Sequence, residues 1–192
     1  MSSRGIRIVP KTKDPMTPFV ELSRQRKWHL RAASARDPAA RTAGEITYWV
    51  PDRNTIVNLR DDVITGVHYF TIDGPHEAEV AEEIRSVIES YTEPELLAWW
   101  DRGAASNDID DKVDAVLFLG VGTPATPTDD YLNRIRAALA DPDKDVRNAA
   151  IVASGYADWP VFKPDLERIA DSDPDETARQ RAAVVVAGWK TR

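Results

Sequence analysis

The sequence predicts an α+β fold: mainly an α-helical solenoid of about three helix pairs, preceded by a small antiparallel β-meander. The first observation is a repeat, because the residues AAIVASGY at 149–156 return as AAVVVAGW at 182–189. The second is a set of three short β-branched runs between residues 45 and 75, separated by turn residues. Strand signals therefore precede helix signals along the chain, which is typical of an α+β protein.

The first segment, residues 1–44, is expected to be a basic N-terminal arm, partly irregular with a short helix. The prolines before residue 19 predict irregular backbone at its start. Phe19, Leu22, Arg26 and Leu30 have the spacing of one face of a short helix.

The second segment, residues 45–92, is expected to hold the β-meander and an amphipathic helix. The runs ITYWV, TIVNL and GVHYFTIDG carry the strand signal and are separated by the turn sequences PDRN and DD. Three strands alone are marginally stable, so the sheet should pack against another element. The segment HEAEVAEEIRSVIES is the expected cover, because its apolar residues recur at helical spacing.

The third segment, residues 93–192, is expected to form helical repeats of about 34 residues. A third copy of the repeat, DAVLFLGV at 114–121, places Gly120, Gly155 and Gly188 at the same position. Each copy combines an amphipathic outer helix with a more apolar inner helix, and one such pair cannot bury its apolar face alone. We therefore expect the pairs to stack.

The stretch DPDKDVRNAAIVASGY at 141–156 resembles the HEAT-like repeat, in the subtype found in bilin-lyase-type and many bacterial HEAT proteins. The residues that carry this resemblance are Asp143, Asp145, Val146, Arg147, Ala149, Ala150 and Gly155. The copy at 173–189 keeps Asp173, Pro174, Asp175, Ala182, Ala183 and Gly188. The resemblance implies a HEAT-like solenoid over about residues 94–190 and leaves the activity open, since such repeats serve many functions.

Aspartates alternate in the turns at 141–145 and 171–175, a pattern that also occurs in calcium loops. A loop of the EF-hand type needs glycine sixth and glutamate twelfth, and neither turn has them. We expect helix capping instead, with Asp141 and Asp173 before a proline at the first helical position and Glu176 closing a capping box on Asp173. Arg147 is expected to bond the acidic turn of a neighbouring repeat.

The charge is distributed unevenly along the chain, whose net charge is −7. Residues 1–45 hold ten Lys/Arg and four Asp/Glu, a balance of +6, whereas residues 46–192 hold 15 and 28, a balance of −13. The basic arm either folds back onto the acidic body, the interpretation we favour, or binds phosphate. The candidate phosphate-binding residues are Arg24, Arg26, Lys27 and Arg31.

An acidic helical surface favours a basic protein partner and accelerates its capture. Aromatic residues often anchor such interfaces. The candidate protein-binding residues are Trp99, Asp108, Asp110, Asp111, Asp114, Asp143, Asp145, Trp159 and Trp189. Trp99 and Trp100 are adjacent and point about 100° apart on a helix, so one can face the core while the other lies exposed.

No catalytic, cofactor-binding or metal-binding residue is assigned. His29, His68 and His76 are too scattered for a metal site of familiar spacing, and no Gly-x-Ser-x-Gly elbow or phosphate loop is present. No apolar run approaches the ~18 residues of a membrane span, and the N-terminus lacks the apolar part of a secretory signal. The absence of cysteine fits a reducing compartment, so we expect a cytoplasmic protein with no membrane partner.

The leading hypothesis is a non-catalytic protein-interaction module, an adaptor or inhibitor that binds a basic protein through its acidic helical surface. By analogy, one concrete form is a bacterial immunity protein or antitoxin. The first alternative is a bilin lyase-like or other modifying enzyme, which the repeat subtype suggests. The second is a nucleic-acid-binding HEAT-like protein that uses the basic N-terminal arm.

Overall fold

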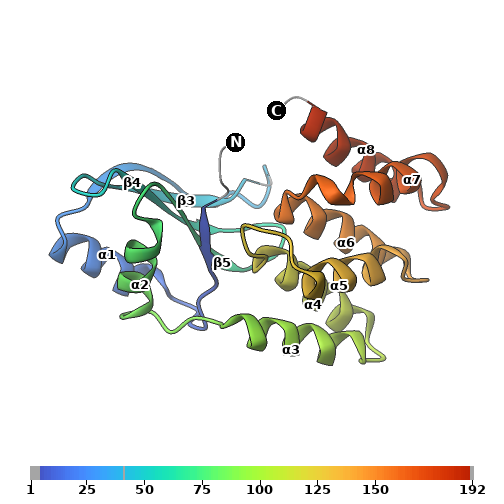
Figure 1. The fold of residues 1–192 in the computed structure, drawn as a ribbon, viewed down its shortest axis with the longest axis horizontal. Coiled ribbons are helices and arrows are strands. Elements are labelled where there is room, and N and C mark those ends of the chain that lie inside the picture. The colour runs from blue at the N-terminus through green and yellow to red at the C-terminus, as the bar shows by residue number, and fades with distance from the viewer. Residues whose placement is uncertain (1–4, 41, 191–192) are drawn as a thin grey trace. The chain divides into compact units, whose positions relative to one another are not determined.

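The computed structural model of the chain describes residues 5–40 and 42–190 (Figure 1). The chain divides into two compact units, Met1–Thr92 and Glu93–Arg192. Each unit has a hydrophobic core of its own. None of the helices in the described residues is both long and apolar enough to cross a membrane.

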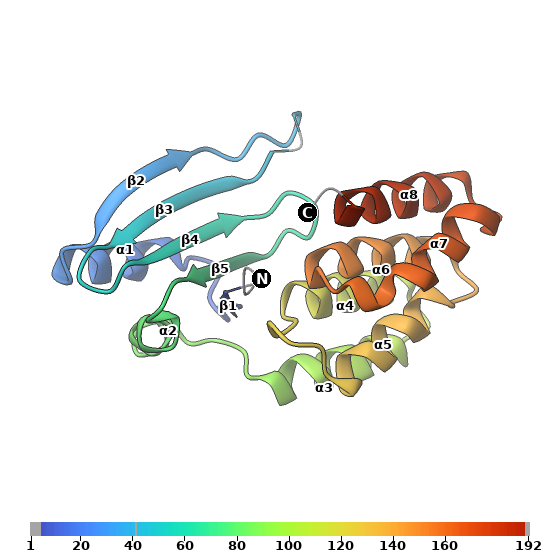
Figure 2. The ribbon, with the colours of Figure 1, turned by 45° about the horizontal axis from the view of Figure 1, so that its top comes forward.

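Over its described residues, the first unit is a five-stranded antiparallel sheet with helices packed against it (Figure 2). The strand order is β1-β5-β4-β3-β2. The strands are β1 (Ile6–Ile8), β2 (His29–Ser34), β3 (Gly44–Val50), β4 (Thr55–Asp61) and β5 (His68–Asp73), and the helices are α1 (Met16–Gln25) and α2 (Glu77–Arg85). Strands β3, β4 and β5 follow one another in the chain and pair with their neighbours in the sheet.

One face of this sheet packs against both helices, and the two-residue period of the strands explains why. Alternate side chains of β3, β4 and β5 point to the same face, and most of the apolar ones on the helix side, such as Val57, Leu59 and Phe70, are almost fully buried. The Phe19 ring of α1 lies edge-on to Tyr48 and Phe70, with ring centroids 5.3 and 4.9 Å apart. Helix α2 adds Val80 and Ile84, both fully buried, to the same core.

Residues 1–44 contribute elements of the sheet unit. Strand β1 pairs with β5 and strand β2 pairs with β3. The expected short helix is present as α1, but Leu30 lies in β2 rather than on the helix face. All six residues of β2 are exposed, so this strand has no buried alternation that would have revealed it in the sequence.

Several basic residues of the segment 1–44 pair with acidic residues that follow later in the same unit. Arg26 lies 2.9 Å from Glu83 and Lys11 lies 3.1 Å from Glu89. Residues 1–92 hold thirteen Lys/Arg and thirteen Asp/Glu, whereas residues 93–192 hold twelve and nineteen. The net charge of −7 therefore belongs to the second unit.

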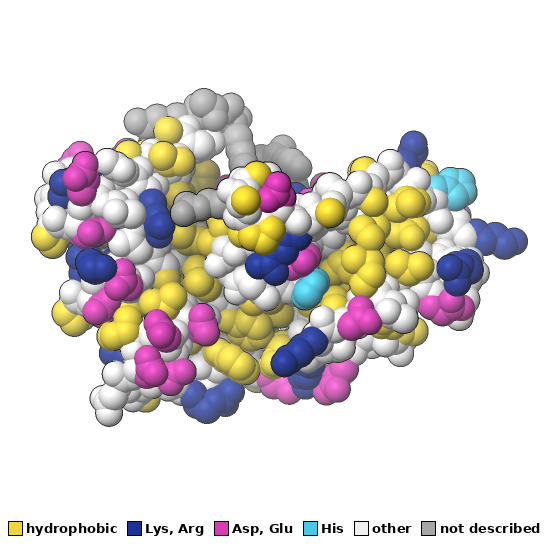
Figure 3. Space-filling view, turned by 180° about the vertical axis from the view of Figure 1, so that it is seen from behind, with side chains coloured by type: hydrophobic (Ala, Val, Ile, Leu, Met, Phe, Trp, Pro, Cys, Tyr) yellow, Lys and Arg dark blue, Asp and Glu magenta, His cyan; other side chains and the backbone are white. Residues whose placement is uncertain are grey.

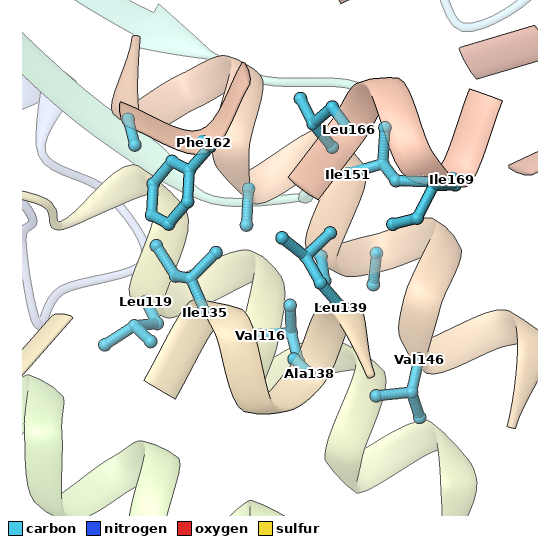
Figure 4. Close-up of a cluster of buried hydrophobic side chains, with 14 of the residues drawn as sticks. Val116, Leu119, Ile135, Ala138, Leu139, Val146, Ile151, Phe162, Leu166 and Ile169 are labelled. Atoms are coloured by element: carbon cyan, nitrogen blue, oxygen red, sulfur yellow. The ribbon is translucent and has the colours of Figure 1, made fainter. Parts of the chain in front are cut away.

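The second unit is helical throughout its described residues. Its elements are α3 (Glu93–Ala104), α4 (Ile109–Val121), α5 (Asp129–Leu139), α6 (Lys144–Ala157), the short 3-10 helix η1 (Pro160–Phe162), α7 (Lys163–Ser172) and α8 (Glu176–Lys190). Helix α6 packs against α4, α5 and α8. Helix α3 packs against α4, and α7 packs against α8. Apolar side chains from α4, α5, α6 and α7 converge in the core between them (Figure 4).

The predicted fold class is wrong. The chain is α+β, but its first unit is a five-stranded sheet with two helices over the described residues rather than an arm and a three-stranded meander, and its helical unit does not show a solenoid. The positions that the repeat aligns have different surroundings. A Cβ atom at Gly120 would lie 2.5 Å from the Cα atom of Ala153, whereas at Gly155 the nearest atom is 3.7 Å away and at Gly188 nothing lies within 4 Å. The three aligned glycines therefore do not share one packing environment.

The aspartates of the acidic turns cap helices, but two residues later than expected. Asp143 accepts a hydrogen bond from the backbone N–H of Asp145 at 2.8 Å, and Asp175 accepts one from that of Ala178 at 2.8 Å. These residues, not Asp141 and Asp173, precede the first helical residues of α6 and α8. The predicted capping box is also not formed as expected, because the Glu176 carboxylate accepts from the Gln180 side chain.

Candidate cation-binding pocket of the helical unit

Helices α3 and α4 flank an open pocket of about 230 Å³ lined by Trp99, Arg102, Gly103, Asp111 and Asp114. Gly103 allows the two helices to approach closely at this point. A Cβ atom there would lie 2.3 Å from the Cβ atom of Ala115 and 2.9 Å from the backbone oxygen of Asp111. The pocket therefore depends on a close helix crossing that a larger residue at 103 would push apart.

The adjacent tryptophans of α3 have different surroundings, as their helical geometry predicts. Trp100 is almost buried in the core, whereas 36% of Trp99 is exposed. The Trp99 ring lies 5.0 Å from the Phe118 ring, and the guanidinium carbon of Arg102 lies 5.8 Å from its centroid. The ring thus already accommodates one guanidinium group within the range of a cation–π interaction.

The first turns of α4 bring several aspartates to the same place. Asp108 is the N-cap and accepts from the backbone N–H of Asp110 at 2.9 Å, and Asp111 accepts from the hydroxyl of Ser106 at 2.8 Å. Among the ion pairs of the described part of the chain, none involves Asp110, Asp111 or Asp114. These three carboxylates consequently carry negative charge without a cationic partner among those residues.

The electrostatic cost of this arrangement is visible at Asp114. Partial burial raises the pKa of its carboxyl group above the usual value, and the neighbouring charges of Asp110 and Asp111 raise it further. Burial and like charges both disfavour the ionised form. A cation placed at the pocket would relieve the repulsion.

The remaining predicted protein-binding residues lie outside this pocket. Asp143 caps α6, and Asp145 lies 2.8 Å from the ammonium group of Lys144. Trp159 is buried and stacks on the Phe162 ring, so it offers no surface to a partner. Trp189 is half-buried and donates to Asp158 at 2.9 Å. The pocket therefore unites Trp99, Asp111 and Asp114, next to Asp108 and Asp110.

The pocket also contains two residues that the sequence did not single out. Arg102 follows Trp99 by three positions, a spacing that places two side chains on one side of a helix, so this signal was present in the sequence. Gly103 gave no such signal, because its role depends on where α4 crosses α3.

The four candidate phosphate-binding residues are not gathered into a free basic patch. Arg24 pairs with Glu21 at 2.9 Å, and Arg26 pairs with Glu83 at the same distance. The Arg31 guanidinium lies 5.7 Å from the centroid of the Trp49 ring. Lys27 is exposed in a left-handed backbone conformation with φ of 57° after α1. This arrangement does not favour phosphate binding by these side chains.

Comparison of the chain with protein-family models, curated proteins and solved structures finds no match. Within the described residues, no three or more His, Asp or Glu side chains are grouped so that they could hold a metal ion. The fold and the site therefore define a two-unit α+β protein with an acidic, tryptophan-lined pocket on its helical unit.

Proposed function

We propose that this chain is a protein-interaction module, an adaptor or inhibitor, that binds a basic segment of a protein partner at the pocket between α3 and α4. The observation that carries the proposal is the group of carboxylates beside the partly exposed ring of Trp99, none of which forms an ion pair with a described lysine or arginine. A cationic side chain in the pocket stacks on the ring and bonds Asp111 or Asp114.

The charge of the helical unit supports the same kind of partner. This unit carries the whole net charge of −7, so its field attracts a basic protein and accelerates the encounter. Steering of this kind raises the association rate more than the final affinity and weakens as salt is added.

Arginine is the side chain that suits this pocket best. Its planar guanidinium stacks on an aromatic face while its N–H groups bond a carboxylate, whereas the lysine ammonium is a compact, strongly hydrated charge. Arg102 already shows that a guanidinium fits over the Trp99 ring. We expect an arginine of the partner to occupy the pocket and to share or replace this stacking.

Binding of a fluorescein-labelled Gly-Arg repeat peptide, followed by anisotropy, tests the proposal. The Arg peptide should bind more tightly than a Gly-Lys peptide of equal length and charge. The double variant Asp111→Asn/Asp114→Asn and the single variant Trp99→Leu should each weaken Arg-peptide binding by about tenfold, because each loses a charge-assisted bond or the stacking contact.

Asp145→Asn is the matched control, since it removes one charge from the same unit at a residue that is paired with Lys144. The single variant Asp114→Asn, which also removes one charge, should weaken Arg-peptide binding more than Asp145→Asn does. Equal weakening by these two single variants would show that only the overall charge matters. Absence of binding by the wild-type chain at low salt would exclude the proposed function.

A basic toxin is one concrete partner of this chemistry, and the chain would then be its immunity protein or antitoxin. A pull-down with wild-type bait, repeated with the Asp111→Asn/Asp114→Asn bait, tests this form of the proposal. A basic protein should be recovered by the first bait and lost with the second. Recovery by both baits would place the contact elsewhere on the chain.

A further inference from the structure

A second pocket, of about 340 Å³, lies in the sheet unit where α1 begins. One side is apolar, with Met16, Ile46 and Leu59, and the other side carries Arg36, Asp61 and His68. Figure 3 shows a broad hydrophobic area on this unit with a histidine and charged side chains at its margin. The volume of the pocket falls at the lower end of the roughly 300–1,000 Å³ typical of small-molecule sites.

The sheet register explains why the core opens at this point. Ile46, Leu59 and Phe70 are neighbours across β3, β4 and β5, and they form an apolar row on the helix side. Two residues along each strand, on the same face, the next row consists of Gly44, Asp61 and His68. Phe70 is fully buried, whereas Asp61 and His68 are partly exposed. The pocket is therefore an unfilled continuation of the core that ends in polar groups.

The polar end is rich in hydrogen-bond donors. Arg36 donates from Nη1 to Oδ1 of Asp61 at 3.2 Å, and Nε2 of His68 lies 3.7 Å from the same oxygen. One carboxylate thus holds an arginine and a histidine side by side. Arginine has five N–H donors and uses one of them in this bond, and histidine can donate from its ring.

The carboxylates near the pocket already have cationic or hydrogen-bonding neighbours. Asp61 accepts from Arg36 and lies 3.7 Å from Nε2 of His68, and Glu45 lies 2.6 Å from the Nε atom of Arg60. Asp14, which acts on His68 electrostatically, accepts from Thr17 and from the backbone N–H of Met16. The Arg36 guanidinium uses one of its five N–H groups on Asp61 and can donate others to a ligand that supplies acceptor oxygens.

We propose that this pocket binds a small amphipathic carboxylate. The apolar body of the ligand lies against Met16, Ile46 and Leu59, and its carboxylate accepts from Arg36 and His68. Gly44 helps to place Arg36, because a Cβ atom at residue 44 would lie 3.0 Å from the backbone nitrogen of Arg36 and would shift that backbone by a few tenths of an ångström. The site is separate from the acidic pocket of the helical unit and does not depend on its function.

Isothermal titration with octanoate, octanamide and octylamine separates the head group from the apolar body. Octanoate should bind, octanamide should bind about tenfold more weakly because it lacks the charge that strengthens the bonds to Arg36, and octylamine should not bind. If the three probes bind equally well, the pocket selects only for an apolar chain and the proposal is wrong. It is equally wrong if octanoate gives no heat at millimolar concentration.

Variants of the full chain locate the binding. Arg36→Gln should weaken octanoate about tenfold and leave octanamide unchanged, because only the charged head depends on the guanidinium. Ala33→Phe, a change on the exposed strand β2 that places a ring in the pocket, should abolish both. Asp114→Asn in the helical unit is the control and should change neither. Thermal melting checks that each variant is folded, and undiminished octanoate binding by folded Ala33→Phe overturns the assignment.

Discussion

Arg147 and Asp173 form a two-point ion pair that joins α6 to the turn before α8. Nε of Arg147 lies 2.8 Å from Oδ2 of Asp173, and Nη2 lies 3.0 Å from Oδ1. Only 11% and 5% of the two side chains are exposed. The same guanidinium donates to the backbone oxygens of Asp141 and Pro142 at 2.9 Å. One arginine therefore fixes two turns that are more than twenty residues apart in the chain. The bond to an acidic turn was expected from the sequence, whereas the stacked repeats in which it was expected are not shown.

Loss of the arginine should destabilise the chain strongly. Arg147→Ala leaves the Asp173 carboxylate and two backbone oxygens without their donors, and breaking a buried pair in this way costs about 3–5 kcal/mol. Urea unfolding measures the loss. Lys144→Ala, which removes an exposed pair, is the control and should cost less than about 1 kcal/mol. Comparable losses would show that the Arg147 pair is no stronger than a surface contact.

The same pair should make stability depend on pH in the acid range. The bond to Arg147 lowers the pKa of Asp173 below its usual value, and further bonds act in the same direction. Because the folded-state pKa is the lower one, the stabilisation is present above the unfolded-state pKa and is lost as the pH falls through the folded-state value. The difference in unfolding free energy between wild type and Asp173→Asn should therefore be large at neutral pH and shrink below about pH 4. A constant difference would assign the pair no role in acid unfolding.

Two glycines that align in the repeat should respond in opposite ways to alanine. At Gly120 the new Cβ atom meets the backbone of Ala153, so Gly120→Ala should cost about 1–3 kcal/mol through overpacking. At Gly188 the space is open, so Gly188→Ala should gain up to about 1 kcal/mol from helix propensity. Chemical unfolding of both variants tests this difference, and equal effects would restore the structural equivalence of the copies.

The helices and central strands were predictable because their signal is local. Burial on one side of an element leaves a periodic pattern in the sequence, as in α2 with Val80 and Ile84. Strands β1 and β2 were missed for physical reasons. Strand β1 has only three residues and pairs with β5, more than sixty positions later, and β2 exposes every side chain. Neither has a pattern of its own, so only the folded sheet shows them.

The candidate site was predictable in part for a similar reason. The exposure of one of two adjacent tryptophans follows from helix geometry, and the acidic residues of α4 are evident from the sequence. That Trp159 is buried, and that Gly103 brings α3 onto α4, depend on tertiary packing. The pairing of Arg26 with Glu83 is likewise a contact between distant segments of one unit, in which thirteen Lys/Arg balance thirteen Asp/Glu.

Asp114→Asn should stabilise the chain at neutral pH, although it removes a charged group from the surface. The raised pKa of Asp114 means that this carboxyl favours folding below its unfolded-state pKa, and that the benefit disappears as the pH rises through the folded-state pKa. Asparagine removes the repulsion from Asp110 and Asp111 at pH 7. The gain should stay below about 1 kcal/mol because the group is exposed to screening solvent.

Asp165→Asn is the matched control for this prediction, because Asp165 accepts from Arg136 at 3.1 Å and should lose stability when neutralised. Thermal unfolding of the two variants in low salt should thus give shifts of opposite sign. Arginine amide, added as a free cation, should raise the melting temperature of wild type more than that of Asp114→Asn, since a ligand stabilises the state that binds it. If Asp114→Asn lowers the melting temperature, the carboxylates of α4 do not destabilise the fold by mutual repulsion. If arginine amide stabilises both chains equally, these carboxylates do not bind the cation.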